Sequence, residues 1–341
     1  MKKLCLILVG LLIASAAALH LGYDAANDQL TDLTMEGYTR RDGDGTLREV
    51  HSLADFGWAY ASPSGNFLLL AEFQNEAFPT VADLRLLDAA GDEVWSKGNR
   101  GFASAVLADD GRTALIEYFG EGPQAPAVVS LLDPSGELVM EIEARPLGEC
   151  RFSADGKLLA VNIAGVELAV FETTSGEQIA SLPSGLVFTL GPEASFVLWA
   201  EADRVIRHQL GERSTLFIET GVEVPRWFSN PEADGDFALA GMDDVFCLCD
   251  GVEYYAELPE GHSIASLDAS ADHRILALGS YLLGEDEGAV WLLDEELVVV
   301  RSWTLYQEDL GGPWPQVLLT PERLWVKTAA GLTSFDREEE R

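Results

Sequence analysis

Four histidines beyond residue 20 are the side chains best suited to acid–base or metal chemistry. They are His51, His208, His262 and His273. Imidazole titrates near neutral pH and binds transition metals, so several histidines gathered in one place indicate a catalytic or metal site. No two of these four stand at a paired metal-ligand spacing, and the chain has no His-Glu-x-x-His motif. We expect isolated, half-buried histidines, and the sequence predicts neither a metal site nor a cofactor.

The pentapeptide GHSIA, residues 261–265, follows the Gly-x-Ser-x-Gly pattern of a nucleophilic serine except at its last position, Ala265. A nucleophile elbow also needs a helix directly after the serine. No helical periodicity follows Ser263. We therefore expect Ser263 to lie where a turn enters a strand.

Three acidic stretches could hold a hard cation through carboxylate oxygens. DGDG, residues 42–45, would need a glycine and a glutamate where Leu47 and Leu53 stand, so we expect a turn there. GEDEG (284–288) and QEDL (307–310) have no such pattern. In a chain this acidic we expect them to be solvated runs of charge.

Strand–turn–strand repeats are the elements that must position these side chains. FSADGKLLAV, residues 152–161, recurs in worn copies at spacings of 38 to 49 residues. Each copy has a strand, a turn rich in Pro, Asp, Gly or Ser, and an apolar strand; glycine adopts positive φ and aspartate bonds its own backbone, so both favour turns. The residues that open the second strand are Asn66, Arg112, Lys157, Ser195, Asp236, Arg274 and Arg323.

A second turn follows about 20 residues later in most copies, so the repeating unit has four short strands. Helical periodicity is missing almost everywhere, which indicates an all-β chain. One such sheet cannot bury two apolar faces alone, whereas seven sheets packed face to face in a ring can. The sequence predicts a seven-bladed β-propeller of four-stranded antiparallel blades, with six or eight blades as the alternatives.

The last copy stops one strand short, after LWVKTA and GLTSFD. A strand-like segment, GTLREVHSL (45–53), stands unattached before the first copy. We expect this N-terminal strand to pair with the last blade, because that pairing would cover two open sheet edges. The sequence then divides into a leader (1–18), an N-terminal extension (19–44), the propeller (45–336) and a charged tail (337–341).

These copies resemble WD-repeat-like propellers of the bacterial extracytoplasmic kind, in the YVTN- and quinoprotein-like superfamily, over residues 45–336. The Trp-Asp dipeptide of true WD repeats is missing, and only LLDAAGDEVWSKG (86–98) resembles a quinoprotein repeat. The resemblance implies a toroid that presents a binding surface. The resemblance does not imply a particular reaction or ligand.

Four long loops indicate where a partner would bind, because function concentrates on loops held by a rigid scaffold. They cover residues 73–82, 118–127, 279–289 and 303–315, and a closed seven-bladed ring would gather them in one sector. Aromatic rings among carboxylates suit a protein or glycan partner. The sector carries Phe78, Phe119, Tyr281, Trp303, Tyr306 and Trp314. The alternative is that these rings fold back and pack the ends of the blades.

The charge of the chain argues against whole classes of partner. Its 341 residues carry a net charge of −35, while 48% are hydrophobic. Such a charge repels nucleic acid and anionic membrane surfaces. A high-salt habitat and simple solubility outside the cytoplasm both account for it, and they stay open as alternatives.

The first twenty residues read as an export leader. Lys2 and Lys3 precede an apolar run and a stretch of small residues, with cleavage expected after Ala16 or Ala18. An uncleaved anchor is the alternative, although the run is short for the roughly 20 residues of a membrane span. We expect cleavage, and no stable membrane insertion of the mature chain.

Three cysteines follow the leader: Cys150, Cys247 and Cys249. The last two stand two apart in a predicted strand, so their side chains point the same way at the outer limit of disulfide reach. We expect buried free thiols, because cysteine packs as a small apolar residue.

Together these observations predict a periplasmic or secreted, monomeric, non-catalytic binding or scaffold propeller. Its protein or glycan partner would bind the long-loop face of blades six, seven, one and two. The alternative is a hydrolase or lyase with a polar site at the mouth of the central channel, where a ring can gather distant His, Asp and Glu side chains. The sequence alone names no catalytic residue.

Overall fold

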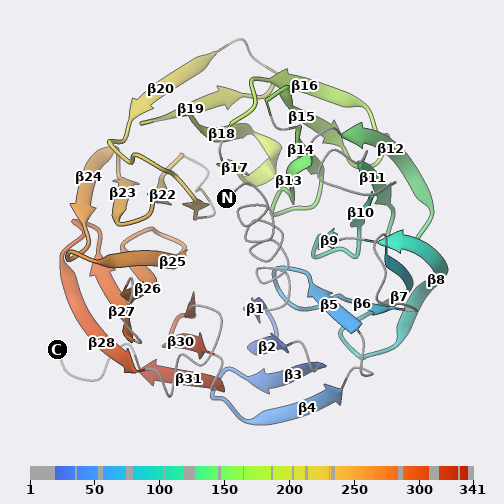
Figure 1. Ribbon diagram of the computed structural model, residues 1–341, viewed down its shortest axis with the longest axis horizontal. Helices are drawn as coiled ribbons and strands as arrows, with labels where there is room; N and C mark the ends of the chain where they lie inside the picture. Colours follow the sequence, from blue (N-terminus) through green and yellow to red (C-terminus); the bar gives the residue numbers. More distant parts are fainter. Residues whose placement is uncertain are drawn as a thin grey trace, which may run out of the picture. The chain divides into compact units, whose positions relative to one another are not determined.

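The computed structural model in Figure 1 describes residues 20–34, 37–52, 57–73, 80–102, 104–118, 127–144, 147–163, 165–185, 187–201, 203–211, 214–229, 231, 235–282, 287–306, 315–328 and 331–336. In these residues regular structure is β-strand apart from one short 3-10 helix, Pro192–Ala194. The strands form eight antiparallel sheets in which strands consecutive in the chain pair with one another. The all-β prediction is confirmed. The chain divides into two compact units, one ending at Ser184 and the other beginning at Gly185.

The first unit holds four four-stranded sheets, named A to D in chain order. Their first strands β1, β5, β9 and β13 contact one another in turn, so successive sheets meet along these strands. Sheet A has β1 (His20–Asp24), β2 (Gln29–Thr34), β3 (Gly37–Asp42) and β4 (Leu47–Ser52); sheet B has β5 (Gly57–Ala61), β6 (Leu68–Phe73), β7 (Thr80–Leu87) and β8 (Glu93–Phe102); sheet C has β9 (Ser104–Leu107), β10 (Thr113–Tyr118), β11 (Ala127–Leu132) and β12 (Leu138–Ala144); sheet D has β13 (Leu147–Phe152), β14 (Leu158–Ile163), β15 (Glu167–Glu172) and β16 (Gln178–Leu182).

The second unit holds sheets E to H, whose first strands β17, β21, β25 and β29 also contact one another in turn. Sheet E has β17 (Val187–Leu190), β18 (Phe196–Glu201), β19 (Arg204–Gln209) and β20 (Thr215–Glu219); sheet F has β21 (Trp227–Phe228), β22 (Phe237–Ala240), β23 (Asp244–Cys249) and β24 (Val252–Glu257); sheet G has β25 (His262–Ala269), β26 (Ile275–Leu282), β27 (Glu287–Asp294) and β28 (Val299–Tyr306); sheet H has β29 (Gln316–Leu319), β30 (Arg323–Thr328) and β31 (Gly331–Asp336).

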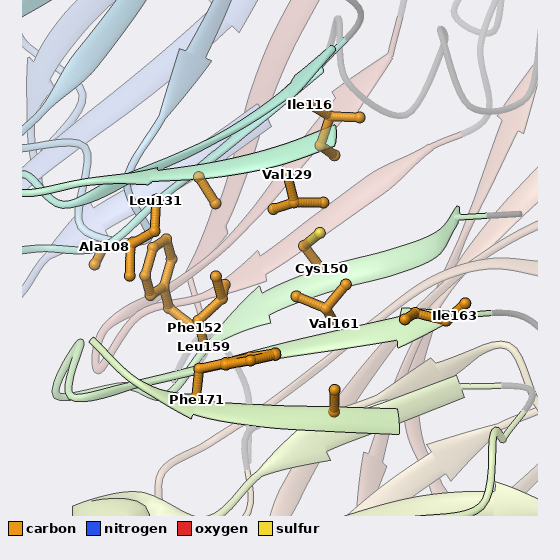
Figure 2. Close-up of a cluster of buried hydrophobic side chains, with 12 residues drawn as sticks. Ala108, Ile116, Val129, Leu131, Cys150, Phe152, Leu159, Val161, Ile163 and Phe171 are labelled. Carbon is orange, nitrogen blue, oxygen red and sulfur yellow. The ribbon is translucent and has the colours of Figure 1, made fainter. Parts of the chain in front are cut away.

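The hydrophobic core of each unit lies between successive sheets. Figure 2 shows the cluster between sheets C and D, where Val129 and Leu131 of β11 lie across from Cys150, Val161 and Phe171 of sheet D. Equivalent clusters join A to B and B to C in the first unit, and E to F, F to G and G to H in the second. Apolar area removed from water is the main stabilising term in folding, so these interfaces hold the sheets together.

The turn that the repeats share has one geometry in several sheets. In sheet D, Ser153 N donates to Leu158 O at 3.0 Å and Gly156 N donates to Ser153 O at 2.9 Å, with Gly156 at φ 68°. Glycine suits that position because it has no Cβ to clash at positive φ. In sheet G the same position is held by His273, at φ 51°.

The predicted count of seven sheets is wrong: the described residues form eight. The seven repeats correspond to sheets B to H, since each marker residue lies at or just before the second strand of one of them. The additional sheet A is built from residues 20–52, which include the expected N-terminal extension. Its second strand, QLTDLT, was not recognised from the sequence because four of its six residues are polar, although Leu30 and Leu33 are fully buried.

The predicted closing strand also has a different partner. Strand β4 occupies most of residues 45–53, and it pairs with β3 in sheet A, with Tyr38 opposite His51 and Arg40 opposite Glu49. The DGDG segment forms the turn between these strands, in which Asp42 N donates to Thr46 O at 2.9 Å. A hairpin to the neighbouring strand closes a short loop, which costs far less chain entropy than pairing with the end of the chain.

The cysteines are buried free thiols, as predicted. Cys247 Sγ lies 3.9 Å from His273 O, and Cys249 Sγ lies 3.8 Å from Asp272 O. Burial raises the pKa of Cys247 to about 12, so its thiol is protonated at neutral pH and unreactive.

Candidate functional site

Three of the six predicted aromatic residues lie at one end of sheet G. Tyr281 is next to last in β26 and pairs with Gly288, while Tyr306 ends β28 opposite Glu287. Trp303 lies three positions before the end of β28. Phe78, Phe119 and Trp314 lie outside the described residues. Two of the long loops, between β26 and β27 and after β28, leave sheet G at this end.

Trp303 is half-buried and packs toward sheet H. Its ring centroid is 4.6 Å from that of Phe335 in β31, and the guanidinium carbon of Arg301 lies 5.3 Å from its centroid. Both contacts come from a strand position, where sequence analysis expected a loop. Trp303 therefore packs the end of the sheet and also forms part of its accessible surface.

A pocket of about 340 Å³ opens between β28 and sheet H. Its lining mixes aromatic and aliphatic groups with hydroxyls, which is typical of ligand-binding hollows near the lower end of the usual size range. The lining residues are Trp303, Thr304, Leu305, Val326, Thr328, Gly331, Leu332, Thr333 and Phe335.

A smaller hollow of about 130 Å³ lies beside β28 where it meets β27 and the start of β25, and Trp303 and Thr304 line both hollows. It is lined by His262, Glu287, Gly288, Ala289, Trp291, Ser302, Trp303 and Thr304. His262 begins β25 and meets Trp291 edge to face, with 5.5 Å between ring centroids.

The hydrogen bonds of Ser280 determine the tautomer of neutral His262. The Ser280 hydroxyl accepts from Trp291 Nε1 at 2.8 Å and donates to Ala289 O at 3.2 Å. His262 Nδ1, which is 3.2 Å from Ser280 Oγ, then donates to it, so in the neutral ring Nε2 is the acceptor. Burial lowers the pKa of His262, and the charge of Glu287 only partly offsets this effect.

The other histidines have separate, local roles. His51 stacks on Tyr38 with 5.2 Å between ring centroids. His208 Nδ1 lies 3.2 Å from Thr215 Oγ1. His273 is buried in its turn, with Nε2 2.9 Å from Ser229 Oγ.

The described residues also do not assemble a nucleophile or a metal cluster. Ser263 lies inside β25 and is 1% exposed, and Ser280 is fully buried, so neither hydroxyl is open to a substrate. Within the described ranges, no three His, Cys, Asp or Glu side chains meet as a group that could hold a metal ion. The aromatic and hydroxyl side chains at this end of sheet G are suited to contact a bound partner.

Sequence reasoning missed Phe335, Thr333 and the hollow around His262. Phe335 belongs to the final copy, where the fourth place was expected to be filled by residues 45–53; that expectation directed attention away from this surface. Nothing in the spacing of His262, Ser280 and Trp291 indicated their contact, because antiparallel pairing with a bulge in β25 brings them together.

No family model and no curated protein match this chain. Solved structures do match: BamB from Moraxella catarrhalis is 15% identical, with 95% of this chain and 96% of that chain covered and a TM-score of 0.64. The C-terminal WD40 domain of Sif2 is 12% identical, with 92% and 93% covered and a TM-score of 0.66. Saccharomyces cerevisiae Sqt1 is 11% identical over 82% of each chain, with a TM-score of 0.59.

The fold is that of a β-propeller. Each sheet of this propeller is a blade, and the structure has eight blades in place of the seven predicted. At these identities the likeness shows the fold alone. In the part of the chain that the structure covers, no helix is long and apolar enough to cross a bilayer.

The inner strands of blades G and H are joined by a carboxyl group with a shifted pKa. Leu319 N of β29 donates to Asp268 Oδ2 of β25 at 2.6 Å, and Ser266 Oγ donates to Pro315 O at 2.7 Å. Burial raises the pKa of Asp268 from 3.8 to about 6, against the effect of the hydrogen bond from Leu319. The ionised form is therefore disfavoured in the folded protein.

This shift predicts a pH dependence of stability. The folded pKa of Asp268 exceeds the unfolded value of 3.8. The stabilisation that the protonated carboxyl contributes to the free energy of unfolding is therefore complete below about pH 4 and is lost as the pH rises through about 6. Asp268→Asn keeps an acceptor for Leu319 and should raise the free energy of unfolding by about 1–2 kcal/mol at pH 7.5, with little change at pH 4. Urea unfolding at both pH values measures this.

Asp272→Asn is the matched control, because its pKa shift has the opposite sign. The Ser270 hydroxyl bonds the Asp272 carboxylate and lowers its pKa, so the stabilisation is present above about pH 4 and is lost on further acidification. Asp272→Asn should therefore give no gain at pH 7.5. A gain of the same size in both variants would show that the effect of Asp268→Asn comes from general charge reduction.

Proposed function

We propose that this propeller is a non-catalytic binding or scaffold module. It holds a protein or glycan partner at the end of blade G where Tyr281, Trp303 and Tyr306 lie. One observation carries the proposal: two hollows, of about 340 and 130 Å³, lie beside β28, and both are lined by Trp303 and Thr304. Aromatic side chains beside hydroxyls give large contact area with few flexible torsions, which favours binding. The rest of the predicted loop sector stays part of the proposal, with Phe78, Phe119 and Trp314 as its further residues.

We propose that the module works outside the cytoplasm as a monomer, in the periplasm or after secretion. The leader over residues 1–18 and the resemblance of the repeats to extracytoplasmic propellers support this location. The net charge of −35 makes nucleic acid an unsuitable partner and favours a basic one.

Affinity capture from envelope extracts tests the proposal. The blocked variant carries Ser302→Arg and Thr304→Arg, two exposed positions on β28 that line the smaller hollow. We expect the wild-type chain to enrich a specific partner and the blocked variant to recover at least tenfold less of it, because two bulky charged side chains close the hollow. Quantitative mass spectrometry of the eluates measures the ratio.

The matched control carries Thr215→Arg and Phe217→Arg, two exposed positions on β20 with the same spacing. It adds the same charge to the outer strand of another blade and should recover the partner as the wild type does. Equal recovery by all three proteins would place binding elsewhere, and failure of the wild type to enrich any partner would contradict the binding function itself.

A further inference from the structure

Among the described residues, blade H has one strand fewer than the other blades. Seven sheets have four strands, whereas the described residues of sheet H give three, and within them β31 pairs only with β30. Third strands elsewhere pair on both sides, and β15, for example, carries four consecutive buried residues, Leu168 to Phe171. In β31 no residue is buried, and Gly331 and Thr333 are exposed. An open antiparallel edge presents backbone N–H and C=O groups that can pair with another strand.

The larger pocket lies between β28 and the β30–β31 hairpin, next to this open edge. It is lined by Gly331, Thr333 and Phe335 of β31 and by Trp303 and Leu305 of the preceding blade. In blade G the place beside the third strand β27 is taken by Ser302 and Thr304 of β28, and the hollow left there is about 130 Å³. Beside β31 no described strand of blade H takes the equivalent place, and the pocket there has a volume of about 340 Å³.

Two segments of this chain are poor candidates for that place. Strand β4, which sequence analysis assigned to it, is already paired with β3. Residues 337–341 are Arg-Glu-Glu-Glu-Arg, and every one is charged. Placing these charged side chains in the pocket against Trp303, Leu305 and Phe335 would cost desolvation, which Arg301 beside Trp303 could offset for one glutamate only.

We propose that a protein partner supplies the fourth strand of blade H by adding an extended segment to the edge of β31. Backbone hydrogen bonds to β31 would give the affinity, and alternate apolar side chains would enter the pocket against Trp303 and Phe335 to give the specificity. The intervening residues are basic, since the chain carries a net charge of −35. This inference rests on the proposed binding function and names the chemistry of the partner.

A synthetic peptide tests this strand addition without the natural partner. The probe is a fluorescein-labelled heptapeptide of alternating lysine and valine or isoleucine, capped at both ends; its control is the same peptide N-methylated at alternate residues along the edge it would offer to β31. N-methylation removes backbone donors while charge and side chains stay the same. We expect anisotropy titration to show binding of the probe and at least tenfold weaker binding of the control. Equal binding of both would overturn the proposal, because it would show charge attraction without strand pairing.

Thr333→Trp in the full chain closes the pocket from an exposed position, and Thr215→Trp on β20 is the matched control. The first should weaken probe binding at least tenfold, and the second should leave it within twofold. Unchanged binding to Thr333→Trp would overturn the proposal. Probe binding that becomes tenfold tighter when residues 337–341 are deleted, or a wild-type dimer in sedimentation that Thr333→Trp disperses, would name the chain's own tail or a second copy as the occupant and would also overturn it.

The peptide titration and the envelope capture fail independently. A probe that binds while capture enriches nothing would leave the strand edge in place and remove the proposed physiological role. Capture that depends on β28 while the probe fails to bind would keep the binding function and remove strand addition.

Discussion

Replacing Arg40 by methionine should lower the free energy of unfolding by about 3–5 kcal/mol. Arg40 lies in β3 and is 4% exposed. Its guanidinium donates to the carbonyl oxygens of Ala89, of Asp88 at 3.2 Å and of Gly65 at 3.4 Å, all in blade B, and it pairs with Glu49 at 3.3 Å. Methionine fills a similar volume but leaves the acceptors without their donor; Gly65 is buried and Asp88 is partly buried, whereas Ala89 is exposed, and a buried unsatisfied group costs about 1–3 kcal/mol.

Arg48→Met is the control for charge and side-chain length. Arg48 pairs with Asp42 in the same blade, but its side chain is 62% exposed, and exposed ion pairs contribute about 0–1 kcal/mol. Urea unfolding of both variants, followed by tryptophan fluorescence, measures the difference. Equal, small losses in the two variants would show that blade A is not joined to blade B by Arg40.

Phe237→Ala should destabilise the second unit by a similar amount, about 3–5 kcal/mol. Phe237 is fully buried between blades E and F, with its ring centroid 5.7 Å from those of Phe228 and Phe246. Truncation removes the transfer free energy of a whole aromatic ring and leaves a cavity that neighbouring strands can only partly fill. The same unfolding assay reports the loss.

Phe217→Ala is the matched control, because Phe217 lies on the outer strand β20 with 58% of its surface exposed. Its loss should stay within about 0.5 kcal/mol, as for most exposed positions. Phe237→Leu should recover most of the loss by refilling the cavity. If Phe217→Ala cost as much as Phe237→Ala, then outer strands would carry as much of the core as the inter-blade clusters do.

The repeats could be read from the sequence because their turns have local chemistry. Ser153 and Gly156 close a turn through hydrogen bonds within a few residues, and the apolar run after it needs no distant information to be recognised. Blade A was missed because its second strand contains Thr31 and Asp32, which are buried polar residues. Thr31 lies against Gly65 of the next blade. A contact between residues far apart in the sequence therefore permits a polar side chain at this buried position.

The candidate site was only partly predictable for a related reason. Loop length directed attention to the end of blade G, and the structure places Tyr281, Trp303 and Tyr306 there. That Trp303 stands in a strand and packs on Phe335 depends on the register of β27 with β28 and on the packing of one blade against the next. Neither is encoded in spacing along the chain. The open edge of β31 was not predicted: residues 45–53 were expected to cover it, whereas β4 in that segment pairs with β3.

Hydrogen–deuterium exchange of the amides in β31, Gly331–Asp336, tests the open edge most directly. In the free protein we expect fast exchange for the amides that point away from β30 and slow exchange throughout β15, which has a strand on each side. Adding the lysine–valine probe should slow the fast set to rates near those of β15. Slow exchange across all of β31 before any peptide is added would contradict the account, because it would mean that a fourth strand already covers blade H.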